Sequence, residues 1–176
     1  MNNSQGSAIV LGLFIGILIV IVLIKTWNKD GRLKTQYDEM QEKARGLAYK
    51  YAFWTIVFVE AVMIVLMSFG IKLPFDNITV HIIPILIGTL VQASYSLWHN
   101  AYAGLNTNMK RFGIISIVIA GVNFLVALIA IFDGRMIVNG IFEFPLTNLI
   151  CGFLFVIIGI ESVIKNHLDN KDREED

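Results

Sequence analysis

Apolar residues fall along this chain in long blocks rather than at the period of a helix face or a strand. About 20 residues of apolar helix span the roughly 30 Å hydrocarbon core of a bilayer. The blocks that approach this length are residues 7–24, 52–71, 78–98, 112–131 and 144–164. The pattern predicts an all-α fold, a polytopic membrane helix bundle with five transmembrane helices, which residues 1–168 form as one unit.

The first block could instead be a cleaved signal peptide. However, no lysine or arginine precedes it, no small-x-small cleavage site follows it, and Lys25 ends it directly. We therefore expect a retained helix. Its Ala8, Gly12 and Gly16 have the small-xxx-small spacing that lets helix backbones approach closely, so this face should pack on another helix in the monomer or a homo-oligomer.

Three segments outside the blocks carry recognisable patterns. Residues 36–51 place apolar side chains along one stripe of a helix and charges on the other face, which predicts a cytoplasmic amphipathic helix leading into the second span. Asn139-Gly140 between short apolar runs suits the type I′ turn of a hairpin. Residues 169–176 form a charged tail that we expect to be disordered.

Composition agrees with a membrane protein, since 56 % of the residues are hydrophobic and 16 % are charged, against about 25 % charged in ordinary soluble domains. The net charge of zero conceals an asymmetry. Twelve of the 14 lysines and arginines lie in residues 25–51, 99–111 and 165–176; only Lys72 and Arg135 lie opposite. The positive-inside rule then predicts an N-terminus outside and a C-terminus inside. No basic-aromatic pattern indicates nucleic acid, so the expected surroundings are the lipid bilayer.

Glu60 is the main candidate for chemistry, because a carboxyl group inside an apolar membrane-length stretch is costly and is a functional-site hypothesis by default. It lies about 13 Å into its span at 1.5 Å per residue. Gln92 and Asn123 lie at depths that predict a polar cluster with it. The cluster could be a proton or cation site; a protonated carboxyl that links helices through hydrogen bonds is the favoured interpretation.

Other polar residues give weaker indications. His81, His99 and His167 fall on different sides or loops, Cys151 is the only cysteine, and no cofactor or metal site is expected. Glu161 lies about one turn from the inner end of its span, where it can reach water or Lys165. The chain has no GxSxG, HExxH or phosphate-cradling pattern, and we expect no enzymatic activity.

Two stretches resemble a known group of proteins. Tyr37-Asp38-Glu39-Met40-Gln41 with Ala44-Arg45-Gly46, and Trp98–Asn106 (WHNAYAGLN), are similar to the cytoplasmic motifs of small polytopic membrane proteins of Firmicutes with a YDERQ-type signature. The resemblance implies a bacterial plasma membrane and a fold, and no particular activity. Met40 and Asn100 depart from the usual arginine and acid, so an ion pair between those positions is absent here.

Both motifs are expected on the cytoplasmic side, where we predict that they dock together as a surface for a protein partner. The candidate residues are Tyr37, Asp38, Glu39, Gln41, Arg45, Trp98, Tyr102 and Asn106. The sequence thus favours a non-enzymatic protein that acts by binding, in an accessory, sensory or immunity-like role. The alternative is a small proton-coupled transporter or oligomeric channel that uses Glu60.

Overall fold

The computed structural model describes the chain except residues 1–17, 24, 27–29, 31–34, 106 and 176. The helices with described bounds are α2 (Glu39–Ser68), α3 (Asn77–Trp98), α4 (Met109–Phe132) and α5 (Leu146–Glu175); residues 18–23 and 25–26 are helical as well. Strands β1 (Ile137–Val138) and β2 (Ile141–Phe142) separate α4 from α5. Among the described residues, four helices are long and apolar enough to cross a membrane.

The predicted all-helical fold is confirmed, and four of the five predicted spans correspond to these long helices. Most of the first span, with Ala8, Gly12 and Gly16, lies outside the described residues, so the five-span count and the orientation stay predictions. Two helices are longer than expected. The amphipathic segment and the second span are one continuous helix, α2, and α5 continues through the expected disordered tail to Glu175.

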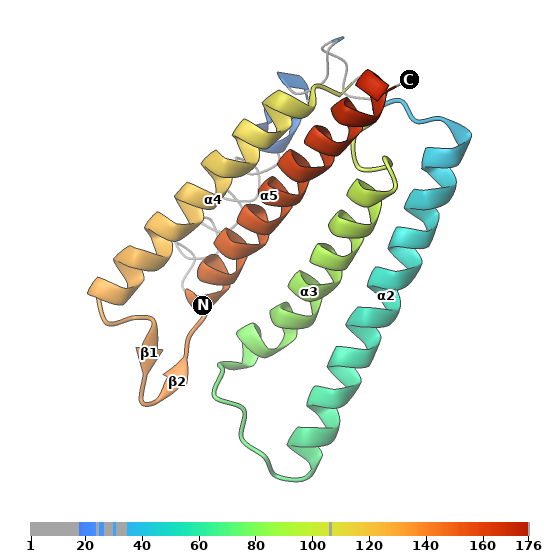
Figure 1. Cartoon of the computed structure of the whole chain (residues 1–176). Coiled ribbons are helices and arrows are strands. Elements are labelled where there is room, and N and C mark those ends of the chain that lie inside the picture. The colour runs from blue at the N-terminus through green and yellow to red at the C-terminus, as the bar shows by residue number, and fades with distance from the viewer. Residues whose placement is uncertain (1–17, 24, 27–29, 31–34, 106, 176) are drawn as a thin grey trace.

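The helices form two antiparallel hairpins. α2 packs on α3, α4 packs on α5, and α3 packs on α5, which places α2 at one edge of the group (Figure 1). The first helix of each hairpin ends in a Schellman motif: Ile71 N–H donates to Leu66 O and Arg135 N–H donates to Ala130 O. The motif needs a left-handed residue before the last donor, and Gly70 (φ 76°) and Gly134 (φ 68°) supply it.

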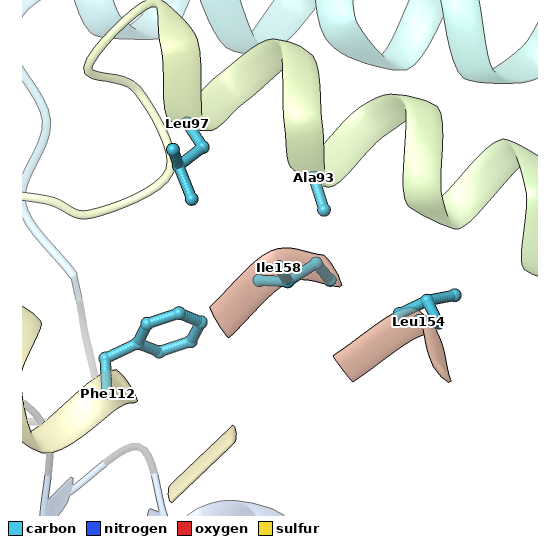
Figure 2. Close-up of a cluster of buried hydrophobic side chains, with 5 residues drawn as sticks. All are labelled: Ala93, Leu97, Phe112, Leu154 and Ile158. Carbon is cyan, nitrogen blue, oxygen red and sulfur yellow. The ribbon is translucent and has the colours of Figure 1, made fainter. Parts of the chain in front are cut away.

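Aliphatic side chains and one aromatic ring form the core where the two hairpins meet. Figure 2 shows Ala93 and Leu97 of α3 facing Leu154 and Ile158 of α5, with Phe112 of α4 beside them. All five residues are buried. The small residue Ala93 lets α3 lie close to α5, so the two hairpins are held as one unit.

The hairpin at Asn139-Gly140 is confirmed. Asn139 (φ 52°) and Gly140 (φ 79°) are both left-handed, as a type I′ turn requires, and the register pairs Ile137 with Phe142 and Val138 with Ile141. An isolated hairpin is marginal in water. Here the α2–α3 connection supports it, because Phe142 N–H donates to Pro74 O and Asp76 N–H donates to Phe142 O, each at 2.8 Å.

Candidate functional site

We call the end of the bundle formed by residues 35–45 and 98–108 the loop end, and the opposite end, with β1 and β2, the hairpin end. At the loop end, the start of α2 docks on the α3–α4 loop. Gln41 Nε2 donates to Asn100 O at 2.6 Å and to Ala103 O at 3.3 Å, and Leu105 N–H donates to Gln36 O at 2.8 Å. Two segments about sixty residues apart are thus joined by three hydrogen bonds.

The docking rests on the way α2 begins. Asp38 is the N-cap: its side chain accepts from Gln41 N–H at 2.7 Å, and Gln41 Oε1 accepts from Asp38 N–H at 3.2 Å. This is a capping box, with Asp38 as the N-cap and Gln41 at the third helical position. Gln41 therefore caps the helix with its oxygen and binds the loop with its nitrogen.

The close approach also depends on small residues. A Cβ atom on Gly104 would lie against Thr35 Cγ2 and Gln36 O. Ala48 of α2 and Ala101 of the loop are fully buried. The buried face of α2 is thus the side of Gln41, Ala48 and Ala52. Of the apolar side chains in the predicted amphipathic segment, Ala48 lies on this buried face. Met40 is 83 % exposed, one position away from the face that docks.

Aromatic side chains surround Arg45 beside these contacts. The Arg45 guanidinium lies 3.9 Å from the ring centroid of Tyr37, and its Nη2 donates to Tyr49 Oη at 3.2 Å. Burial raises the pKa of Tyr102 to about 12, so its hydroxyl keeps its proton at neutral pH. The Tyr102 ring also packs edge-on against Phe112, with centroids 5.0 Å apart.

A hollow of about 190 Å³ opens between these residues. The residues that line it are Thr35, Tyr37, Arg45, Gln92, Tyr102, Ala103, Thr107 and Phe112. Pockets for drug-sized ligands are larger, at about 300–1,000 Å³. The hollow has room for one side chain or a small anion, and its single cation is Arg45.

The structure thus gathers Tyr37, Gln41, Arg45 and Tyr102 of the predicted docking surface and uses Asp38 as the cap. Glu39 and Trp98 lie nearby with exposed side chains, and Asn106 lies outside the described residues. Gln92, Thr35 and Thr107 were missed as parts of the hollow. The sequence signal for Gln92 was present, since a polar residue inside an apolar block is expected to face other polar groups rather than lipid.

The predicted cluster of Glu60, Gln92 and Asn123 is wrong. Glu60 Oε1 lies 2.7 Å from His81 Nδ1, Gln92 Nε2 donates to Ser96 Oγ at 3.3 Å, and Asn123 Nδ2 donates to Ile119 O at 2.9 Å. Gln92 follows His81 by eleven residues, about 16 Å along α3. Glu60 and His81 lie eight and four residues from the ends of α2 and α3 that a short loop joins, so counting from that loop predicts the pair.

The structure does not pair Glu161 with Lys165, one of the two partners expected for it. Lys165 pairs instead with Asp169, one turn farther along α5, and this pair helps to keep the charged end of α5 helical. Glu161 Oε2 is buried without a hydrogen-bond partner among the described residues. His99 Nδ1 lies 2.8 Å from Tyr95 O, and the described part of the chain brings together no three His, Cys, Asp or Glu side chains that could hold a metal ion.

The fold and the site define a helical protein of the multi-pass membrane class, with a polar hollow at its loop end. No protein-family model, curated protein or solved structure matches the chain.

Proposed function

We propose that this protein is a five-span protein of the bacterial plasma membrane that acts without catalysis, by binding a protein partner at its loop end. The observation that carries the proposal is the docking of α2 on the α3–α4 loop by Gln41. This docking positions Arg45 beside the hollow. The distribution of basic residues supports a cytoplasmic loop end. The resemblance to membrane proteins of Firmicutes supports the bacterial membrane.

The surroundings of Arg45 indicate which chemical group of the partner would bind here. No carboxylate pairs with it among the described residues, and its bond to Tyr49 uses one of its five N–H donors. A guanidinium binds carboxylates through two parallel hydrogen bonds. We therefore propose that an acidic side chain of the partner enters the hollow, in an accessory, sensory or immunity-like role.

Removing Arg45 should weaken the proposed binding of the partner's acidic side chain. A photoreactive side chain at Leu105, which is exposed at the loop end, is expected to crosslink a partner in living cells. The same side chain at Phe132, which is exposed at the hairpin end, should not. Charged hydrogen bonds contribute about 1.5–3 kcal/mol, so Arg45→Ala should weaken the Leu105 crosslink roughly tenfold or more. Equal crosslinks from both ends, or an adduct unaffected by Arg45→Ala, would contradict the proposal.

The Glu60–His81 contact favours a second candidate, a small proton-coupled transporter or oligomeric channel. A carboxyl group 2.7 Å from an imidazole can share and exchange a proton, and both groups lie on helices of membrane length. For this function, Glu60→Gln should abolish proton flux into liposomes that hold the purified protein, measured with an enclosed pH-sensitive dye. Flux equal in both proteins, or no flux in the wild type, removes this candidate.

A further inference from the structure

The Glu60–His81 pair faces outward from the α2–α3 hairpin. The side chains of His81 and Glu60 are 62 % and 29 % exposed. Glu60 lies about 12 Å, and His81 about 6 Å, from the helix ends at the α2–α3 connection. Exposed apolar neighbours such as Ile64 and Ile85 need no cover, because lipid tails are as apolar as leucine. The polar pair needs such cover, because ionisable groups at this depth almost always face a bundle interior or a cavity.

Among the described residues, one donor and one acceptor of the pair have no partner. When it carries no net charge, the shared proton sits on Glu60 or on His81 Nδ1, and in both forms Nε2 carries a hydrogen. Glu60 Oε2 remains as an acceptor. The exposed polar atoms are therefore self-complementary: the Nε2–H of one copy matches the Oε2 of another.

We infer that a second copy of this chain covers the pair, so that two Glu60 and two His81 side chains form one cluster at a two-fold axis parallel to the membrane normal. Two copies with the same orientation place identical residues at the same depth, as an isologous interface requires. Each His81 Nε2–H then donates to Glu60 Oε2 of the partner subunit. This interface lies at α2 and α3, away from the loop end, so it is independent of the proposed partner site.

The described part of the first helix does not supply this cover. Arg111 of α4 donates from Nη1 to Thr26 O at 3.2 Å, and Val22 and Leu23 line a hollow with Ile114 and Ile115. Residues 18–23 and 25–26 thus lie beside α4, whereas α2 lies at the opposite edge of the row α2–α3–α5–α4 (Figure 1). The second copy is the occupant whose polar atoms match by symmetry.

Cysteine crosslinking in native membranes tests the dimer in a Cys151→Ala background. At about 100° per residue, Ile64 lies about 40° from Glu60 around α2, and Phe58 lies about 160° away. Both side chains are exposed. Ile64→Cys is expected to give a disulfide-linked dimer on oxidation, and Phe58→Cys should not.

The double substitution Glu60→Leu with His81→Leu shows whether the pair causes the association. Because both polar partners become apolar, the fold should be kept, and an unchanged melting temperature in detergent checks this. Loss of the two interhelical bonds should weaken dimerisation roughly tenfold. Equal crosslinking from Ile64→Cys and Phe58→Cys, an undiminished dimer in the double-leucine variant, or a product joined to a different protein would each overturn the inference.

Discussion

Gly88→Leu is expected to separate α2 from α3 and to lower the stability of the protein. A Cβ atom at Gly88 would lie against Ile56 Cγ1, 2.7 Å from Ile56 Cδ1 and 3.1 Å from Ala52 O. Ile56 can change rotamer, but a helix carbonyl oxygen moves only with its backbone. Overpacking of this kind costs about 1–3 kcal/mol, and the helices must part to accept the rest of the leucine. The free energy of unfolding in detergent measures the loss.

Gly46→Leu is the matched control. Gly46 also lies inside a helix, but no atom is within 4 Å of its added Cβ. Leucine is a better helix former than glycine by roughly 0.8 kcal/mol, so this variant should be as stable as the wild type or slightly more stable. The same chemical change should therefore have opposite effects at the two positions. If Gly88→Leu unfolds at the same denaturant concentration as Gly46→Leu, the close contact of α2 with α3 at this point is wrong.

The sequence predicted those parts of the fold that depend on nearby residues. Asn139-Gly140 specifies its turn by itself, because few other residues adopt two left-handed conformations in succession. Block 78–98 coincides with α3 within one residue, since Asp76 caps the helix where the apolar residues begin. The start of α2 at Glu39, capped by Asp38, lies three residues from the predicted start of the amphipathic segment at residue 36. Hydropathy alone marks where lipid begins, so it divided this one helix into an amphipathic segment and a span.

The candidate sites depended on contacts between distant segments, which a single sequence specifies less well. The loop-end residues were found because Gln41 and Tyr102 lie in motif stretches placed on one side by charge. The partner of Glu60 was missed because depth was counted from the other end of each span. His81 lies near a span end, and helix ends are the least certain positions in a hydropathy pattern. The short α2–α3 connection places Glu60 beside His81. Its length is known only when the ends of both helices are known.

Gln41→Glu is expected to undock the loop end while it leaves the start of α2 intact. The substitution keeps the side-chain shape and the oxygen that accepts from Asp38 N–H, and glutamate at this position is the usual partner in a capping box. The new carboxylate cannot donate to Asn100 O or Ala103 O, and it places negative charge against both oxygens. One of the two hydrogen bonds is exposed and the other is partly buried. Their loss costs about 0.5–1.5 kcal/mol each, so the loop should separate from α2.

Amide hydrogen exchange at Leu105, which donates to Gln36 O, measures this separation directly. Exchange should accelerate in Gln41→Glu and stay at the wild-type rate in Glu42→Gln, which changes charge by one unit at the adjacent exposed position. Acidification that protonates the new carboxyl group should bring the Leu105 exchange rate back toward that of the wild type at the same pH, because the protonated acid can donate to Asn100 O. An unchanged Leu105 rate in Gln41→Glu would show that Gln41 does not hold the loop.

If the loop is held this way, Gln41→Glu should also lose the Leu105 crosslink to the partner although Arg45 is present, because Arg45 then no longer lies beside the docked loop.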